Sequence, residues 1–285
     1  MSELKLRRVA LAGHSWRVAG WEDDSFFRHA GRHMHGMAEL ADVARAALPP
    51  QGGVVVDVGA NLGLSALVLA PLAARMLAVE ASPRTAAALR RTLAANGLEA
   101  RVAVAAVALG AAPGEQAFHD SPHSAGSHLL SQETLDGATR PSVTVPVETL
   151  DALVARHGLE RVDFIKIDVE GHETEVLDGA AATLARHRPT VFLEFNSWVL
   201  QANRRANPRA VLEDWLARFP VAHALRGTAP PMRITPATLL DFLHDHLVKR
   251  GCGDDLVLGF NAAWVDHWRP GQGMAAAGAG SSPGR

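Results

Sequence analysis

A turn-forming string, Asp57-Val-Gly-Ala-Asn-Leu-Gly63, and a glutamate beyond it, Glu80, carry residues that could bind a small ligand. Glycines in a turn let backbone N–H groups approach a ligand closely. The carboxylate of Glu80 could accept hydrogen bonds from both hydroxyls of a ribose. Asp57 would either accept from a donor on the ligand or order the turn. The candidate ligand-binding residues are therefore Asp57, Gly59, Asn61, Gly63 and Glu80.

The order of these residues bears on the kind of ligand. A nicotinamide dinucleotide site needs the pattern Gly-x-Gly-x-x-Gly, whereas position 61 is Asn and the acidic residue precedes the glycines. The pattern therefore favours S-adenosylmethionine over a dinucleotide. Taken alone, the glycines also fit a tight turn and Glu80 a solvated strand end, but their combination favours a cofactor site.

A second string, Ile165-Lys-Ile-Asp-Val-Glu-Gly-His-Glu173, brings three titratable side chains together. Asp168 and Glu170 are two residues apart, so both carboxylates lie on one face if the strand continues that far. If the cofactor's methyl group goes to a hydroxyl, the transfer requires in-line positioning and removal of the hydroxyl proton. His172 has the intrinsic pKa of a suitable base, and the carboxylates could orient it or take the proton instead. The candidate catalytic residues are His172, Asp168 and Glu170.

Other roles stay open for the same residues. Asp168 could contact the amino group of the cofactor, which makes it a candidate cofactor-binding residue as well. His172 could cap or pack against the start of a helix. Glu194 could complete an acidic cluster with Asp168 and Glu170, and such oxygen ligands suit Mg²⁺. A divalent metal is possible but not favoured, because no spacing here is diagnostic of a metal site.

Strands and helices alternate along the chain and so position these residues. Apolar β-branched runs predict strands at 54–58, 75–80, 101–107, 162–168, 190–195 and 255–260. Helical patterns cover 37–48, 64–72, 82–94, 149–157, 173–187, 209–218 and 236–250. The alternation predicts a doubly wound, Rossmann-like α/β sheet with helices on both faces and ligands at the carboxyl ends of its strands.

The segment 110–148 interrupts the alternation and predicts an inserted hairpin and loop. Val143-Thr-Val-Pro-Val147 has the composition of a strand, and Ser121-Pro-His-Ser-Ala-Gly-Ser-His128 that of a substrate-side loop or an ordinary solvated one. Residues 1–36 show little periodicity and predict an N-terminal cap segment. Residues 263–285 are predicted as a flexible tail, because they become rich in Gly, Ala and Ser.

Composition argues against some classes of partner. The formal net charge is −2 and the pI about 6.7, so no positive field gathers nucleic acid, and no apolar stretch is long enough to span a membrane. The first residues lack the order of a secretory signal, and the single cysteine, Cys252, cannot form an intrachain disulfide. We therefore expect a cytoplasmic protein that binds neither nucleic acid nor membrane.

The chain resembles the FkbM family of methyltransferases. The resemblance lies in Val56–Gly63, Val79-Glu80 and above all Ile165–Glu173, and also in Pro146–Asp151, Glu175–Ala180 and Pro189–Glu194. It covers roughly residues 37–262, which it marks as a methyltransferase domain with the sheet of class I methyltransferases. The family implies S-adenosylmethionine as cofactor and O-methylation of a hydroxyl on a small molecule, natural product or glycan, so the expected partner is a hydroxylated small-molecule acceptor.

Three other functions share some of these features. The same fold and cofactor could methylate nitrogen on an amine or a protein side chain, which only the product would reveal. A catalytically silent module that binds a cofactor or a partner is disfavoured by the presence of all the carboxylates and the histidine. A nicotinamide oxidoreductase lacks its glycine pattern.

Overall fold

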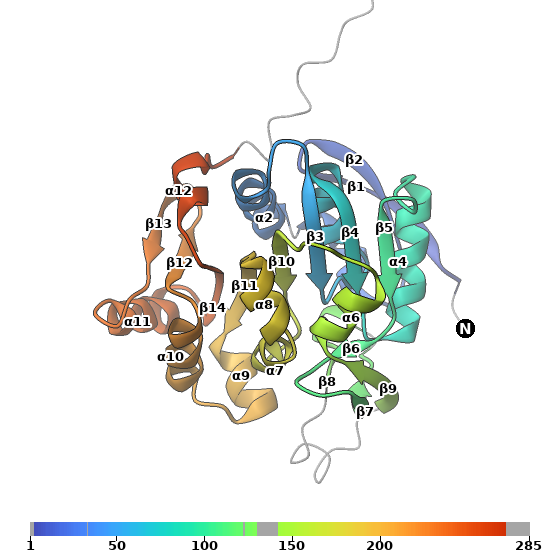
Figure 1. The fold of residues 1–285 in the computed structure, drawn as a ribbon. Coiled ribbons are helices and arrows are strands. Elements are labelled where there is room, and N and C mark those ends of the chain that lie inside the picture. The colour runs from blue at the N-terminus through green and yellow to red at the C-terminus, as the bar shows by residue number, and fades with distance from the viewer. Residues whose placement is uncertain (1–2, 33, 122, 130–141, 272–285) are drawn as a thin grey trace, which may run out of the picture.

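A mixed sheet forms the centre of the molecule. The computed structural model describes residues 3–32, 34–121, 123–129 and 142–271, and within them eight strands form one sheet, in the order β13-β12-β14-β11-β10-β3-β4-β5 (Figure 1). Strands β5, β4, β3, β10 and β11 run parallel, whereas β14, β12 and β13 run antiparallel to their neighbours. The strands are β3 (Gly53–Val58), β4 (Ala73–Val79), β5 (Val102–Ala105), β10 (Phe164–Ile167), β11 (Thr190–Asn196), β12 (Val221–Arg226), β13 (Ala229–Arg233) and β14 (Gly253–Gly259).

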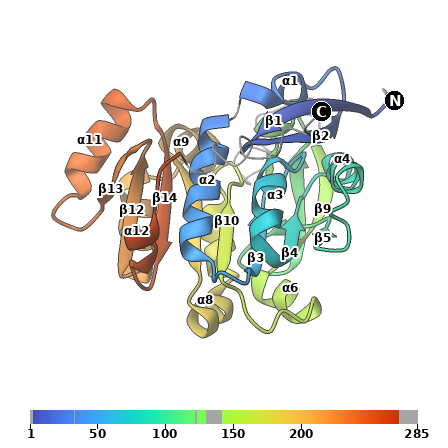
Figure 2. The same cartoon turned by 90° about the horizontal axis from the view of Figure 1, so that it is seen from above.

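Helices cover both faces of this sheet. One face packs against α2 (Met34–Ala47), α3 (Leu64–Leu69), α4 (Pro83–Ala95) and α12 (Ala263–His267), and α2 and α3 lie side by side (Figure 2). The other face packs against α6 (Leu150–Arg156), α7 (Glu173–Asp178), α8 (Ala181–His187), α9 (Ser197–Arg204), α10 (Pro208–Arg218) and α11 (Leu239–Lys249). Residues of one strand alternate between the two cores, as Val55 and Val56 of β3 do. The predicted doubly wound, Rossmann-like α/β class is confirmed.

The segment between β5 and α6 forms a separate small sheet. Its strands are β6 (Ala108–Leu109), β7 (Gly114–His119), β8 (His128–Leu129) and β9 (Ser142–Glu148), in the order β6-β9-β7-β8. The predicted hairpin corresponds to the antiparallel pair β7 and β9, and the 3₁₀ helix Ser124–Gly126 precedes β8. Pro122 of the predicted substrate loop lies outside the described residues.

The N-terminal segment has more regular structure than its sequence predicted. Strands β1 (Lys5–Leu11) and β2 (His14–Gly20) form an antiparallel hairpin, followed by the short helix α1 (Ser25–Arg28). The hairpin packs on α4, and the backbone N–H of Ala19 donates to Thr92 Oγ1 at 2.9 Å. Val9, Leu11 and Val18 are buried in the main core, so this cap extends the core.

The structure differs from the prediction in three further places. The helix predicted at 173–187 is two helices, α7 and α8, separated at Gly179, where an added Cβ would lie 2.1 Å from the carbonyl oxygen of Gly110. The predicted flexible tail begins with α12, and Trp264 and Trp268 are buried in the core; residues 272–285 lie outside the described part. Helix α9 and strands β12 and β13 had not been predicted.

None of the helices in the described part of the chain combines the length and apolar composition that a bilayer span requires.

Candidate active site

A cavity of about 280 Å³ lies at the carboxyl ends of the parallel strands. This is the edge at which doubly wound sheets bind their ligands. Most of the predicted site residues line it, and they come from the turn after β3, the residue after β4, the segment after β10 and strand β11. They are Gly59, Asn61, Glu80, Asp168, Glu170, His172 and Glu194.

The turn after β3 requires glycine for space as well as for backbone conformation. Gly59 has φ +77°, and an added Cβ would lie 1.8 Å from the carbonyl oxygen of Asp168. Gly63 caps α3 with φ +96°, and its Cβ would lie 2.8 Å from Leu89 Cδ1. Gly63 is thus needed for helix packing, and it lies outside the cavity wall. Asn61 also has a positive φ, and it lines the cavity.

Glu80 orders the turns that follow β3 and β4. Its Oε2 accepts a hydrogen bond from the backbone N–H of Asn61, and its Oε1 accepts one from that of Ser82, both at 2.9 Å. The side chain is buried, and burial raises its pKa to about 7 despite these two hydrogen bonds. Each carboxylate oxygen can accept a further hydrogen bond, so Glu80 keeps accepting capacity toward the cavity.

Asp57 lies beneath the cavity wall and is fully buried. Its Oδ2 accepts from Ser65 Oγ at 2.7 Å, and its Oδ1 is 3.7 Å from Lys166 Nζ. Burial raises the pKa of Asp57, and the charge of Lys166 opposes that rise. Of the two roles predicted for Asp57, this position fits ordering the turn.

Lys166 is a site residue that the sequence analysis did not identify. Its Nζ donates to the carbonyl oxygen of Gly59 at 3.0 Å and lies 3.3 Å from Asp168 Oδ2. Burial alone would lower the pKa of Lys166, but the carboxylates of Asp168 and Asp57 raise it above the ordinary value. A lone cation in the buried strand Phe-Ile-Lys-Ile was the signal that could have revealed it, because a lysine is rarely fully buried unless it is paired.

The segment after β10 departs from the expected geometry. The strand ends at Ile167 rather than continuing to Glu170, which has φ +56°. Glu173 holds the resulting turn, because its Oε1 accepts from the backbone N–H groups of Val169 and Gly171, at 3.1 and 3.2 Å. Strand alternation is therefore not what brings Asp168 and Glu170 to the cavity; this turn does.

Two carboxyl groups of the cavity wall hold protons unusually strongly. Burial, with the nearby charges of Asp168 and Glu173, raises the pKa of Glu170 to about 8. Burial together with Asp168 and Glu170 raises the pKa of Glu194 to about 9. Crowded carboxylates in a poorly solvated place favour the protonated form, and such perturbed groups are common in active sites.

His172 precedes α7 and lines the cavity. It is buried, and burial lowers its pKa to about 4. Its Nδ1 lies 3.7 Å from Glu175 Oε2, beyond hydrogen-bond distance, and has no hydrogen-bond partner in the described structure. The ring is therefore neutral at pH 7.

Within the described ranges, no three His, Cys, Asp or Glu side chains are grouped closely enough to hold a metal ion.

Comparison with known families identifies the domain. The family model described as the methyltransferase FkbM domain matches residues 57–219, more than half of the chain. The chain belongs to this family.

Three curated relatives match parts of the chain. Hexuronic acid methyltransferase AglP of Haloferax volcanii is 32% identical over 132 residues, which are 46% of this chain and 51% of that protein. Methyltransferase sdnD of Sordaria araneosa is 30% identical over 158 residues, which cover 46% of this chain and 61% of that protein. AMB antimetabolite synthetase AmbE of Pseudomonas aeruginosa is 33% identical over 180 residues, which cover 50% of this chain and 8% of that protein. The chain thus spans less than two thirds of each of these relatives.

Solved structures also resemble the chain at low identity. Methyltransferase FkbM from Methylobacillus flagellatus has a TM-score of 0.44 at 16% identity, with 73% of this chain and 43% of that chain covered. The O-methyltransferase TomG from Streptomyces achromogenes has a TM-score of 0.48 at 15% identity, with 86% and 92% covered.

The FkbM domain match begins at Asp57 and ends at Phe219, so it includes every site residue predicted from the sequence. The cavity extends beyond it. Phe26 of α1 and Met37 of α2 also line the cavity, although both precede the matched range. The N-terminal segment therefore adds part of the site wall to the FkbM domain.

Proposed function

We propose that this protein transfers the methyl group of S-adenosylmethionine to a hydroxyl group of a small molecule, natural product or glycan. The observation that carries the proposal is the cavity at the carboxyl ends of β3 and β4, walled by Glu80 and Asn61, within the range matched by the methyltransferase FkbM domain. Relatives named as a hexuronic acid methyltransferase and a methyltransferase support the same class of reaction.

The residues of the first turns fit this cofactor. Glu80 would accept the ribose hydroxyls, since its oxygens keep free lone pairs. Asn61 Oδ1 is buried without a hydrogen-bond partner in the described structure, so it would accept from a donor on the cofactor. Gly59 would keep the turn close to the cofactor, Asp57 and Gly63 would order that turn, and Asp168 would face the amino group. Bound S-adenosylmethionine would supply an electrophilic methyl group on its sulfonium.

The same wall supplies groups that can take the acceptor's proton. Glu170 has a pKa of about 8, so its carboxylate form is a base well matched to neutral or slightly alkaline conditions. His172 is neutral at pH 7 and lines the cavity, so its ring would accept a hydrogen bond from the acceptor hydroxyl. We assign proton removal to Glu170 and orientation of the hydroxyl to His172, with Lys166 holding Asp168 in place.

An amine acceptor is the second candidate. The cavity wall carries the carboxyl groups of Glu80, Asp168, Glu170 and Glu194, and carboxylates attract a cationic amine. Transfer from S-adenosylmethionine with a labelled methyl group, followed by NMR of the product, distinguishes an O-methyl from an N-methyl group.

Calorimetric titration with S-adenosylmethionine tests the proposal. We expect the parent protein to bind and Glu80→Ala to bind at least 100-fold more weakly, since two hydrogen bonds to a charged group contribute about 1.5–3 kcal/mol each. Glu80→Gln tests the charge alone, and Glu160→Ala, on an exposed residue, is the matched control. Circular dichroism establishes that each variant is folded.

The outcomes separate two claims. If folded Glu80→Ala binds as tightly as the parent, the ribose assignment is wrong. If the parent does not bind S-adenosylmethionine, the proposed function itself is wrong.

A further inference from the structure

Part of the cavity wall comes from two segments that lie about a hundred residues apart in the chain. Phe26 of α1 and Met37 of α2 supply one part, whereas Phe118, Ser124 and Leu129 belong to the small second sheet and its loop. Helix α1 lies against the 3₁₀ helix Ser124–Gly126. The two segments thus meet beside the cavity.

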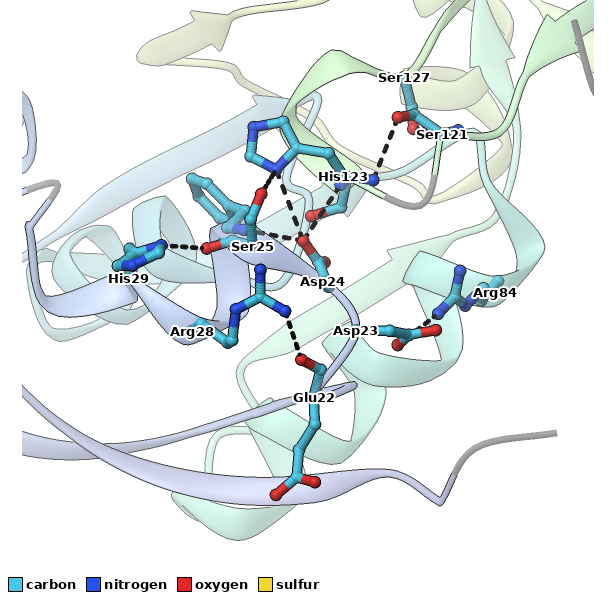
Figure 3. Close-up of polar contacts among 12 residues, drawn as sticks. Glu22, Asp23, Asp24, Ser25, Arg28, His29, Arg84, Ser121, His123 and Ser127 are labelled. Carbon is cyan, nitrogen blue, oxygen red and sulfur yellow. Dashed lines mark hydrogen bonds and ion pairs between the residues drawn. The ribbon is translucent and has the colours of Figure 1, made fainter.

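One buried carboxylate joins them. Asp24 is 1% exposed, and its Oδ1 accepts from the backbone N–H of Phe26 at 2.9 Å and from that of Ser124 at 3.3 Å. His123 Nδ1 lies 3.8 Å from the same oxygen and 2.5 Å from Ser25 Oγ (Figure 3). Asp24 therefore fixes Phe26 and Ser124 relative to each other, and both line the cavity.

This wall carries a hydroxyl with no internal partner. Ser124 is 8% exposed, and its Oγ has no hydrogen-bond partner within the described structure. A buried hydroxyl without a partner is unfavourable, so its place on the cavity wall suits a polar group of a bound molecule. Phe26, Phe118 and Leu129 add apolar side chains to the wall of the same cavity.

The start of α2 lies near the strand pair that carries Glu194. Met37 follows Gly36, at which an added Cβ would lie 3.7 Å from Asp255 Oδ2. Asp255 is the partner of Glu194 in the register of β11 and β14. Since Glu194 and Met37 both line the cavity, α2 borders the part of the site to which Glu194 belongs.

Charge restricts what this wall can bind. Four carboxyl groups line the cavity, and Lys166 is the one lysine or arginine among its described lining residues. Lys166 is already held between Asp57 and Asp168. An anionic group on the acceptor would therefore meet no free cation and several carboxyl groups.

We propose that Phe26, Phe118 and Ser124 form the acceptor subsite, and that it selects an uncharged hydroxylated molecule with an apolar ring over an anionic one such as a uronic acid. Asp24 is the positioning residue of this subsite. The inference rests on the proposed methyl transfer, since it names the acceptor class of the same site. It gives part of substrate selection to Phe26, which precedes the matched methyltransferase domain.

Binding of two matched probes tests the selection. The probes are 2-naphthol and 6-hydroxy-2-naphthoate, which differ by one carboxylate, titrated into protein saturated with S-adenosylhomocysteine. We expect 2-naphthol to bind at least 10-fold more tightly than the naphthoate, and more tightly than methyl β-D-glucopyranoside, which lacks an apolar ring.

Variants locate the subsite. Phe26→Ala and Ser124→Ala should each weaken 2-naphthol binding at least fivefold and leave the Kd for S-adenosylmethionine within twofold of the parent. Asp24→Ala should weaken 2-naphthol binding similarly, and Asp24→Asn, which keeps an acceptor oxygen, should restore most of it. Leu6→Ala, at an exposed position of β1, is the control and should change neither Kd.

Each result that contradicts the proposal overturns a different part of it. Tighter binding of the naphthoate, or no binding of 2-naphthol, overturns the assigned acceptor class. A loss of S-adenosylmethionine binding in Phe26→Ala or Ser124→Ala assigns this wall to the cofactor and overturns the subsite. Failure of the parent to bind S-adenosylmethionine contradicts the proposed function instead, so the two failures are distinguishable.

Discussion

Two groups of polar and titratable side chains lie near β11 and β14, and they differ in whether they could form an active site. The sealed cluster consists of Ser197, His246 and Asp254, with His246 Nε2 2.8 Å from Ser197 Oγ and His246 Nδ1 2.7 Å from Asp254 Oδ2. Those are the residue types and contacts of a hydrolytic triad. The cavity cluster consists of Lys166, Asp168, Glu170, His172 and Glu194, which match no such template.

Accessibility and hydrogen bonding distinguish the two. Ser197 and His246 are fully buried, both ring nitrogens of His246 have partners, and Asp254 also accepts from Arg226 and Arg250. The cavity cluster faces open space, contains an imidazole nitrogen without a partner, and has carboxyl groups with strongly raised pKa values. Residue types and distances alone would identify the sealed cluster as the active site. Hydrogen-bonding groups without partners beside a cavity identify the cavity cluster instead.

Removing the carboxylate of the sealed cluster should have the largest effect on stability. Asp254→Ala leaves His246 and the guanidinium of Arg226 without their buried partner, which lowers the free energy of unfolding by about 3–5 kcal/mol. The protein that remains folded should bind S-adenosylmethionine with an unchanged Kd. Urea unfolding followed by circular dichroism measures the free energy of unfolding, and calorimetry below the unfolding transition measures the Kd. A decrease in unfolding free energy of less than about 1 kcal/mol would mean that the cluster is not needed for stability.

Removing the cation of the cavity cluster should affect both stability and binding. Lys166→Met leaves Asp57 buried without a counter-charge and frees Asp168, so we expect a loss of about 2–3 kcal/mol in unfolding free energy and weaker binding of S-adenosylmethionine. Lys249→Met is the matched control, because its ion pair with Asp245 is exposed and contributes at most about 1 kcal/mol. Unchanged binding of S-adenosylmethionine in Lys166→Met would show that this lysine does not contribute to the cofactor site.

The pH dependence of stability reports on Glu194. Its folded pKa, about 9, lies above the ordinary 4.5, so the folded state holds the proton more strongly than the unfolded state does. The stabilisation is complete below pH 4.5 and is lost as pH rises toward 9. Glu194→Gln should therefore be close to the parent in stability at pH 5 and more stable than it at pH 8.5, the difference growing by up to about 1.4 kcal/mol per pH unit between the two pKa values. Thermal melts across this range provide the test, with the exposed Glu99→Gln as control; parallel curves for parent and variant would contradict it.

The smallest effect is expected at the serine of the sealed cluster. Ser197→Ala removes one hydrogen bond to His246 and should lower unfolding free energy by about 1 kcal/mol, with methyl transfer unchanged. A fluorophosphonate probe, which reacts with activated serines, should leave Ser197 unlabelled in the folded protein because the hydroxyl is buried. Labelling at Ser197 would mean that the cluster opens and works as a nucleophile.

Sequence patterns predicted the parallel half of the fold better than the antiparallel half. Runs such as 54–58 and 162–168 are apolar because both faces of those strands are buried, and both became strands close to the predicted bounds. Strand β13 escaped prediction because it contains Pro230 and Pro231, which argue against a strand unless it lies at a sheet edge. It does lie at the edge.

The site residues also differ in how far the sequence could predict them. Glu80 and the Asp168–His172 string could be found because local motifs end at the edge of the sheet. Phe26 and Ser124 could not, because their meeting depends on one buried carboxylate between segments about a hundred residues apart. Lys166 lay inside a recognised string, and its importance emerged from the two carboxylates that hold it, Asp57 on the neighbouring strand β3 and Asp168 just past the end of β10.

The pairing of β3 with β10 also constrains how the chain matures on the ribosome. Lys166 lies beside Asp57 in the register, although more than a hundred residues separate them. At about 5–20 residues per second, roughly 5–20 s of synthesis pass before the partner strand emerges. During that interval the N-terminal half carries an exposed apolar strand edge in the middle of the future sheet, and such edges are open to mispairing. Protection of this edge by a chaperone would therefore matter most before residue 167 is made.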